Sequence, residues 1–336
     1  MNGPGMPAGP AAVVSGLGTC LPPRVVSNEE LSRQLDTSDE WIVRRTGIRR
    51  RHVVDPGSAT SVLAAEAGRR ALKSAQCDRA DAVVLATSTP DRPCPATAPE
   101  VASSLGLGPV PAFDVAAVCA GFVYALATGA GLISTGIAHR VLVIGADTFS
   151  TILDPGDRTT RAIFGDGAGA VVLRRGEPGE PGALGPFDLG SDGELAELIM
   201  VPAGGSRQRA TGVPAPAGGE YFAMQGKPVF KQAVVRMSES VRRVLALAGW
   251  SVGQVDRLVA HQANSRILGA LADNLTVPHD RVVSNIERVG NTVAASIPLA
   301  LADGGLRPGE KVLITSFGGG LSWGSTVLSW PDVLPG

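Results

Sequence analysis

Short apolar runs rich in β-branched residues alternate along the chain with longer stretches of helical periodicity. The runs are continuously apolar, which predicts strands that are covered on both faces of a sheet. These strands are predicted at residues 12–16, 82–86, 141–145, 170–173, 257–260, 311–315 and 325–328. Helices are predicted at residues 29–35, 59–74, 96–105, 120–135, 231–248, 265–274 and 294–302. The alternation predicts an α/β fold with largely parallel sheets.

Two turn-rich stretches interrupt this alternation. Residues 174–183 are polar and rich in glycine and proline, which is typical of a connection between two halves. Residues 201–220 are again rich in glycine and proline and predict a surface loop. Residues 1–10 lack the apolar core of a secretory signal and predict a disordered tail.

One segment has the length of a membrane span. No charged residue occurs from Val115 to Ala138. Alanine and glycine dominate it, with serine and threonine among them, so its tendency to enter a bilayer is low. We therefore expect a buried helix in a tightly packed core, and no membrane insertion.

The overall composition suits a globular enzyme with a large core. The chain has 336 residues, of which 44% are hydrophobic and 18% are charged, with a net charge of -1. This charge balance gives no support to nucleic-acid binding. The four cysteines have no metal-type spacing, so we expect no metal site, free thiols and a cytoplasmic location.

Cys119 is the candidate nucleophile. It follows an extended run at residues 111–115 and precedes the uncharged helix, so the thiol is expected at a helix N-terminus. There the helix dipole and free N–H groups favour the thiolate and can hold the oxyanion of a thioester. The alternative is a buried cysteine that acts as a small hydrophobic residue.

A histidine and an asparagine downstream complete a candidate acyl-transfer site. His261 ends the strand at 257–260, and strand ends are where catalytic groups gather in open α/β sheets. Asn291 lies between Gly290 and Thr292 ahead of a helix. A structural histidine and an asparagine helix cap are the alternatives.

Several motifs, in order along nearly the whole chain, resemble β-ketoacyl-ACP synthase III, a condensing enzyme with the thiolase fold. They lie at residues 36–42, 45–48, 114–121, 164–170, 261–264, 290–292 and 317–320. The resemblance implies a five-layered αβαβα fold built from two duplicated halves, at 11–176 and 177–336, and a homodimer. It also implies that Val141–Gly145 and Val312–Thr315 are duplicated core strands.

The resemblance implies a two-step reaction without a bound cofactor, since acyl-CoA is a substrate. Cys119 takes an acyl group from acyl-CoA, and malonyl-ACP then loses carbon dioxide and condenses with it. His261 and Asn291 hold the thioester oxygen of the enolate. The N–H groups of Cys119 and Gly319 hold the oxyanion of the acyl-enzyme.

Further contacts follow from the same resemblance. The implied CoA-binding residues are Thr37, Trp41, Arg45, Thr46, Arg158 and Asn264. The implied acyl pocket comprises Cys94, Phe149, Phe164, Ile199, Phe222, Met224 and Phe317. Lys231 and Arg266 are the candidate contacts for the carrier protein.

Two positions depart from the family pattern. Cys94 stands at a gate position where phenylalanine is common, and it reaches the partner's acyl pocket, so we expect a deeper pocket than in short-primer enzymes. Phe149 and Phe222 are bulky and work against that expectation. Asp273 and Asn274 occupy helix positions where relatives can carry lysines, so the carrier can be a dedicated polyketide or natural-product protein.

Other functions stay open at this point. An acyltransferase of the same fold would move acyl groups to a hydroxyl or an amine, without needing an enolate site. A non-catalytic partner subunit is disfavoured by the intact triple of Cys119, His261 and Asn291. A thiolase normally uses a second cysteine near the C-terminus, and no cysteine follows Cys119.

Overall fold

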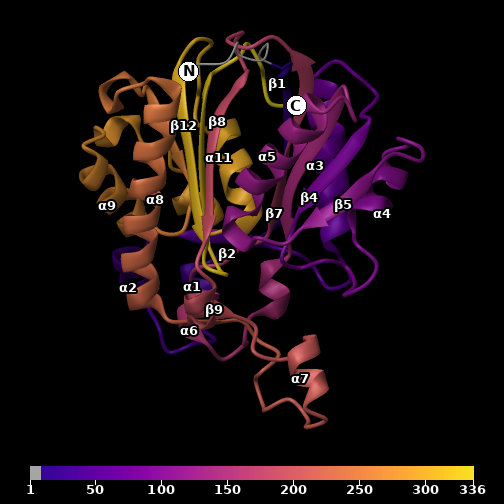
Figure 1. The fold of residues 1–336 in the computed structure, drawn as a ribbon. Coiled ribbons are helices and arrows are strands. Elements are labelled where there is room, and N and C mark those ends of the chain that lie inside the picture. The colour runs from indigo at the N-terminus through magenta and orange to yellow at the C-terminus, as the bar shows by residue number, and fades with distance from the viewer. Residues whose placement is uncertain (1–8) are drawn as a thin grey trace.

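The structure, a computed structural model, describes residues 9–336 and consists of five layers, αβαβα (Figure 1). Most of the predicted tail, residues 1–8, lies outside the described residues. The strands are β1 Ala11–Cys20, β2 Arg24–Ser27, β3 Arg50–Val53, β4 Ala82–Ala86, β5 Ala112–Val115, β6 Arg140–Asp147, β7 Gly167–Gly176, β8 Leu184–Ser191, β9 Ile199–Met200, β10 Ala223–Met224, β11 Arg257–Ala260, β12 Lys311–Gly318 and β13 Ser322–Ser329. The helices are α1 Asn28–Ser32, α2 Asp39–Thr46, α3 Thr60–Ser74, α4 Ala98–Ser104, α5 Gly121–Ser134, α6 Arg158–Arg161, α7 Ser206–Ala210, α8 Gly226–Ala248, α9 Ser265–Leu275, α10 Ile286–Val289 and α11 Ser296–Asp303.

Two sheets of matching topology form the second and fourth layers. Their strand orders are β1-β7-β6-β4-β5 and β8-β13-β12-β11. Helices α3 and α4 cover the outer face of the first sheet, α8 packs on the second with α9 against it, and α5 and α11 lie between the sheets (Figure 1). An equivalent of β5 in the second sheet is reduced to a single parallel bridge between Leu258 and Val282. The five layers and the duplication are confirmed; the boundary between 176 and 177 stays a prediction.

The expectation of largely parallel sheets is wrong. Pairs β4–β5, β4–β6 and β11–β12 are parallel, but β1–β7, β6–β7, β12–β13 and β13–β8 are antiparallel. The tight turn between β12 and β13 shows one cause. Gly320 has φ +123°, a conformation that favours glycine and lets the chain reverse directly into its neighbour.

All the predicted strands and helices occur. β4 and β11 have the predicted ends, the others have shifted ends, and several elements have no prediction. Strand β8 was missed because glycine and proline interrupt its apolar pattern. Helix α2 was missed although Ser38 caps its start and Gly47, with φ +76°, ends it. Helix α8 begins at Gly226, five residues before its predicted start.

The uncharged segment is confirmed as a buried helix. Helix α5 has 14 residues, about 21 Å at 1.5 Å per residue, which is too short for a bilayer core of about 30 Å. Small residues let its surroundings pack closely: a Cβ on Gly145 would lie 2.3 Å from the carbonyl oxygen of Ala294. In the described part of the chain, no helix has both the length and the apolarity to span a membrane.

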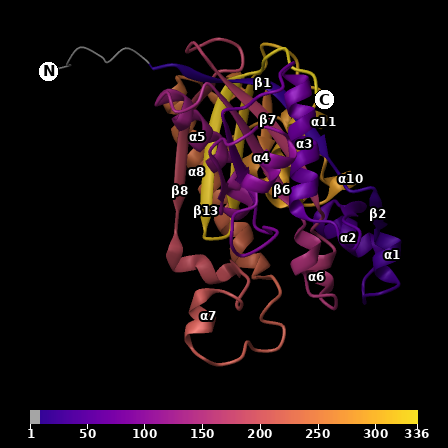
Figure 2. The ribbon, with the colours of Figure 1, turned by 90° about the vertical axis from the view of Figure 1, so that its right-hand side faces the viewer.

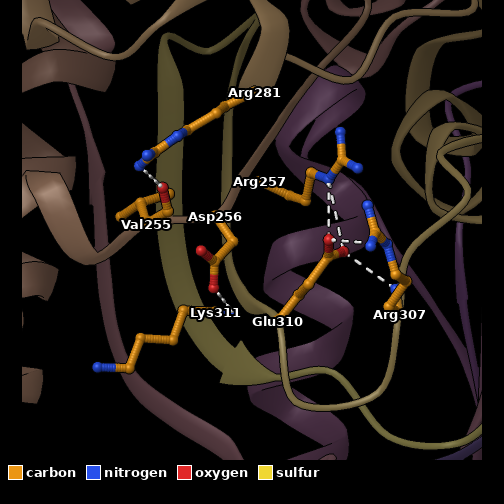
Figure 3. Close-up of polar contacts among 7 residues, drawn as sticks. All are labelled: Val255, Asp256, Arg257, Arg281, Arg307, Glu310 and Lys311. Atoms are coloured by element: carbon orange, nitrogen blue, oxygen red, sulfur yellow. Dashed lines mark hydrogen bonds and ion pairs between the residues drawn. The ribbon is translucent and has the colours of Figure 1, made fainter.

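An aspartate before one strand of each half fixes the start of the neighbouring strand. The carboxylate of Asp256 accepts from the N–H of Lys311 at 2.8 Å, and the N–H of Asp256 donates to the carbonyl of Lys311 at 2.9 Å (Figure 3). Asp81 is its counterpart, and its carboxylate accepts from the N–H groups of His139 and Arg140, each at 2.8 Å. These side chains set the register in which β11 meets β12 and β4 meets β6.

The predicted surface loop projects from one end of the molecule. It carries the short helix α7, whose residues are largely exposed (Figures 1 and 2). The chain returns from it through Phe222, whose N–H donates to the carbonyl of Ile152 at 2.8 Å. The loop therefore begins and ends beside the pocket described next.

Candidate active site

Cys119 occupies a strained turn between β5 and α5. The 3₁₀ turn Val118–Ala120 begins with Val118 at φ +46°, and α5 starts two residues after the cysteine. The same geometry recurs in the other half, where Val293 has φ +53° ahead of α11. A branched residue in this region is strained, so the surrounding structure must hold the turn in place.

The prediction that this turn favours the thiolate is wrong. Burial raises the pKa of the Cys119 thiol well above its ordinary value, and the charge of Asp147 raises it further. The helix N-terminus acts in the opposite direction, but desolvation is the larger effect. The raised pKa favours the neutral thiol for this candidate nucleophile.

Asp147 is a buried carboxylate that the sequence analysis did not single out. It follows the core of β6 and accepts from the N–H of Ser88 at 2.7 Å and from that of Ala294 at 3.0 Å. Burial raises its pKa to about 7. Its contact with Ala294 ties the second strained turn to the first sheet. A charged residue directly after an apolar strand is the signal that could have identified it.

His261 directly follows β11 and is 3% exposed. Burial lowers its pKa to about 3, so the imidazole is neutral. Its Nδ1 lies 2.6 Å from the hydroxyl of Ser296, the first residue of α11. The same hydroxyl accepts from the N–H of Gln262 at 3.4 Å.

The Ser296 hydroxyl holds the His261 ring in place. The hydroxyl has one proton and two lone pairs, so it can accept from Gln262 and also either donate to or accept from Nδ1. When the hydroxyl donates, Nδ1 accepts and Nε2 carries the proton. Ser296 gives no local signal in the sequence, because it lies far along the chain from the histidine.

Asn291 closes a local turn and also lines the site. Its Oδ1 accepts from the N–H of Val293, two residues further on, at 2.9 Å. The N-cap of the following 3₁₀ turn is Thr292, so the helix-cap alternative is wrong. The backbone N–H of Asn291 donates to the carbonyl of Ile163 and its carbonyl accepts from the N–H of Gly165, both at 2.9 Å. With Oδ1 occupied, the amide Nδ2 group is the part of the side chain left to donate to a ligand.

One pocket of about 540 Å³ brings these groups together. Cys119, His261 and Asn291 all line it, although they lie far apart in the sequence. Its other lining residues are Trp41, Arg45, Thr46, Thr159, Ile163, Phe164, Ile199, Phe222, Met224, Gly226, Lys227, Val229, Phe230, Ala233, Met237, Ala263, Asn264, Arg266, Ile267, Phe317 and Gly318.

The second half approaches the nucleophile through Gly318. A Cβ at Gly318 would lie 2.7 Å from the backbone nitrogen of Cys119. Gly319, the predicted oxyanion donor, is the next residue, and a Cβ there would meet Val118 at 3.3 Å. The glycine run thus brings the end of β12 against the cysteine turn.

The predicted CoA-binding residues divide into two groups. Trp41, Arg45, Thr46 and Asn264 line the pocket, whereas Thr37 and Arg158 do not. The guanidinium carbons of Arg45 and Arg158 each lie 5.2 Å from the centre of the Trp41 ring. Both guanidinium groups therefore already contact the Trp41 ring, although Arg158 does not line the pocket.

The polar side chains among the predicted CoA-binding residues differ in how many of their hydrogen bonds are already made within the protein. The Thr46 hydroxyl donates to the carbonyl of Ile42 at 2.7 Å and accepts from the N–H of Ile48 at 3.0 Å. Asn264 caps α9 by accepting from the N–H of Ile267 at 2.9 Å. The buried hydroxyl oxygen of Thr37 has no partner in the structure. Thr46 and Asn264 thus already serve the helices that carry them.

Aromatic rings crowd the predicted acyl pocket. Phe164, Ile199, Phe222, Met224 and Phe317 line the pocket, and Phe149 is buried behind them. The ring centres of Phe149, Phe164 and Phe222 lie 4.7–5.1 Å apart. Cys94 is exposed and does not line the pocket of its own chain.

Basic side chains at the pocket mouth include one that the sequence analysis missed. Arg266 lines the pocket and lies 5.7 Å from the ring centre of Phe230, whereas Lys231 is exposed outside the lining. Lys227 lines it instead. It was missed because α8 begins earlier than its periodicity indicated. Among residues 9–336, no cluster of His, Cys, Asp or Glu could hold a metal ion.

Comparison with known proteins places this site in a family. Residues 113–193 match the family model for 3-oxoacyl-[acyl-carrier-protein (ACP)] synthase III, and residues 245–330 match its C-terminal model. β-Ketoacyl-[acyl-carrier-protein] synthase III 3 of Streptomyces coelicolor is 62% identical over 331 residues, 97% of this chain and 99% of the relative. The chain belongs to the 3-oxoacyl-[acyl-carrier-protein] synthase III family.

Solved structures agree with this assignment of the synthase. The 3-oxoacyl-(acyl carrier protein) synthase III of Pseudomonas aeruginosa PAO1 superposes with a TM-score of 0.91 at 55% identity, covering 97% of this chain and all of the other. The priming β-ketosynthase of the R1128 polyketide biosynthetic pathway superposes with a TM-score of 0.89 at 36% identity, covering 98% of this chain and 99% of the other. The thiolase-like fold of the synthase is thereby confirmed.

Proposed function

We propose that this synthase starts fatty-acid or polyketide chains by joining an acyl group from acyl-CoA to malonyl-ACP, with loss of carbon dioxide. The observation that carries the proposal is the convergence of Cys119, His261 and Asn291 on one pocket with a basic and aromatic mouth. A thiol at a strained turn supplies the nucleophile. Two neutral N–H donors supply a site for an enolate oxygen.

In the first step, the Cys119 sulfur attacks the thioester carbon of acyl-CoA. The bond from that carbon to the CoA sulfur breaks, and the cysteine proton leaves with CoA as its thiol. The N–H groups of Cys119 and Gly319 would hold the oxyanion. The close approach of Gly318 to Cys119 supports this arrangement.

In the second step, malonyl-ACP loses carbon dioxide and the electron pair moves onto its thioester as an enolate. The Nε2–H of His261 and the Nδ2 group of Asn291 donate to the enolate oxygen. The carbanion then attacks the acyl-cysteine, and the released sulfur of Cys119 regains a proton. Summed over both steps, the reaction consumes one proton and releases CoA and carbon dioxide.

The neutral state of His261 suits this role. An imidazole with a pKa of about 3 is a poor base, so it does not compete for the proton of the thiol. When Ser296 donates to Nδ1, Nε2 keeps its proton and remains a donor. Transfer to a hydroxyl or an amine would need a base to take the proton of that acceptor. Because His261 is a poor base, its protonation state favours condensation.

The CoA nucleotide would bind at the pocket mouth. Trp41 and Arg158 would hold the adenine, and Arg45 and Lys227 would meet phosphates, with Thr37 and Thr46 nearby. Asn264 would face the pantetheine arm. Lys231 and Arg266 would contact the acidic carrier protein.

A homodimer in the cytoplasm completes the proposal. The exposed loop with Cys94 would reach the partner's acyl pocket, so each site needs both subunits. A small side chain there would leave a deeper pocket for medium or branched primers. The crowding of Phe149, Phe164 and Phe222 limits that depth from the other side.

Two measurements test the function separately. Intact mass after incubation with a panel of acyl-CoAs should show one acyl group per chain in the wild type and none in Cys119→Ala. The acylated enzyme should then release carbon dioxide from malonyl-ACP, and Asn291→Ala should slow that release about a hundredfold while acylation persists. Acylation followed by transfer to an amine or hydroxyl, without carbon dioxide release, would instead establish the acyltransferase.

A further inference from the structure

A second cavity, of about 150 Å³, lies behind the active-site wall and is lined by three arginines. It is formed where β2, β3 and α6 meet the segment that follows β6. Its polar lining residues are Arg24, Glu30, Arg51, Ser150 and Arg161. Phe164 also lines it and is shared with the larger pocket.

Arg51 is a buried cation without an acidic partner. It is 1% exposed, and none of the described carboxylates lies within ion-pair distance of it. Its terminal nitrogens donate to the carbonyl of Val26 at 3.3 Å, to Oδ1 of Asn28 at 2.8 Å and to the carbonyl of Ala162 at 2.7 Å. Its Nε has no partner. A buried unpaired charge is costly, so a counterion is expected here.

Arg161 adds a second uncompensated charge. The one polar contact of its side chain among the described residues is a 3.5 Å approach to the carbonyl of Pro155, and the guanidinium forms no ion pair with a described carboxylate. Burial and, to a smaller extent, the charge of Arg161 lower the pKa of the Arg51 guanidinium to about 10. The two cations repel each other unless an anion lies between them.

The remaining charges of the cavity do not cancel this excess. Glu30 is already paired with Arg24 at 3.0 Å. The hydroxyl of Ser150 donates to Asp166 at 2.6 Å, so its proton is taken. The guanidinium groups of Arg51 and Arg161 thus keep an uncompensated positive charge. Planar guanidinium groups are well suited to bind oxyanions.

We infer that this cavity binds a small inorganic oxyanion of the phosphate type, held between Arg51 and Arg161. The volume is enough for one such ion and too small for a nucleotide. The site is separate from the pocket mouth, where Arg45 and Lys227 face CoA. Phe164 lines both cavities, so the ion would lie directly behind the wall that carries it.

Thermal unfolding at constant ionic strength tests this inference. Replacing chloride by phosphate should raise the Tm saturably, by about 2 °C at ten times the Kd. Arg161→Gln should abolish the rise, and Arg161→Lys should keep part of it. Arg45→Gln is the matched control, because it removes a cation from the pocket mouth and should leave the rise intact.

The location of the ion can be read directly. A crystal soaked in selenate should show an anomalous peak within hydrogen-bond reach of Arg51 Nε and the Arg161 guanidinium. A rise in Tm that survives Arg161→Gln, or that disappears in Arg45→Gln, would overturn the inference. So would a selenate peak confined to the pocket mouth. None of these readouts depends on the proposed reaction.

Discussion

His261 and Cys119 share one pocket, and burial moves their pKa values in opposite directions. It lowers the pKa of the imidazole to about 3 and raises that of the thiol. An ion pair between them is therefore disfavoured, because burial penalises both charged forms. His261 is therefore a neutral hydrogen-bonding group beside the neutral thiol of Cys119. It does not act as the base that removes the proton of the thiol.

The pH dependence of the two steps should differ for this reason. Acylation needs the thiolate, and with the pKa raised its rate should climb about tenfold per unit across roughly pH 6 to pH 9. Carbon dioxide release should show no acid limb from His261 there, because its pKa of about 3 lies below the range. Intact mass against time and carbon dioxide release by pre-acylated enzyme measure the two profiles. A fall in release centred near the ordinary histidine pKa that persists in Asp147→Asn, which removes the other group titrating near pH 7, would refute the buried neutral imidazole.

Ser296 should act by positioning His261. In Ser296→Ala, Nδ1 loses its partner at 2.6 Å, so the imidazole can rotate and exchange tautomers. Carbon dioxide release should slow about tenfold while acylation of Cys119 is retained. An equal loss in both steps, or none in either, would mean that the hydroxyl serves only the packing of α11.

Two strained turns define the site at the scale of elements. Val118 and Val293 both have positive φ and precede the central helices α5 and α11. One turn carries the nucleophile and the other carries the backbone N–H that binds Asp147. Asn291 stands two residues before Val293 and lines the pocket with Cys119, so both copies of the turn contribute to the candidate site.

The contact between β12 and the cysteine turn should tolerate no side chain. In Gly318→Ala, the new Cβ would lie 2.7 Å from the Cys119 nitrogen and 3.0 Å from its Cβ. The turn must shift, and acylation should fall about a hundredfold. Gly269→Ala is the control, since its nearest neighbour would be His279 at 3.8 Å; this variant should acylate normally.

The two strand-start aspartates should contribute to stability in proportion to the N–H groups they bind. Asp256→Ala frees one backbone N–H and should lower the free energy of unfolding by about 1 kcal/mol. Asp81→Ala frees two and should cost about twice as much. Denaturant titration of both variants measures the difference. Equal costs would show that these carboxylates do not act through the backbone bonds that they accept.

At the scale of the whole molecule, the site lies where the two halves meet, and the proposed dimer would complete it. Cys119 belongs to the first half, whereas His261 and Asn291 belong to the second. Gly145 of β6 approaches Ala294 of the second turn so closely that no side chain would fit. Catalysis is therefore tied to the packing of the halves rather than to either alone.

Primer choice should depend on the residue contributed by the partner subunit. In Cys94→Phe, the ring should shorten the acyl pocket and shift the kcat/KM ratio toward acetyl-CoA, by about fourfold for each methylene excluded. Cys94→Ala keeps a small side chain and should leave the preference unchanged. Steady-state kinetics with acetyl-CoA and a medium-chain acyl-CoA measure the ratio. An unchanged ratio in Cys94→Phe would remove this loop from the acyl pocket.

The sequence by itself determined the principal strands and helices, the buried character of α5 and the three candidate residues that meet in one pocket. Continuous apolarity reports burial on both faces, and small residues around Cys119 report close packing, so both are visible locally. The motifs around Cys119, His261 and Asn291 were enough to identify the family. The missed elements, such as β8 and α2, are those whose signals are short or broken by glycine and proline.

Only the tertiary structure decided the direction of the sheet pairs, the protonation of the pocket and the partners of its residues. Strand direction depends on how the connections return, as at the Gly320 turn, and not on apolarity. The pKa of Cys119 depends on how much of the whole molecule excludes water from it, which outweighed the local helix N-terminus. Ser296, Lys227 and the Arg51–Arg161 cavity became visible only once distant segments were brought together, because desolvation and contact are properties of the folded chain.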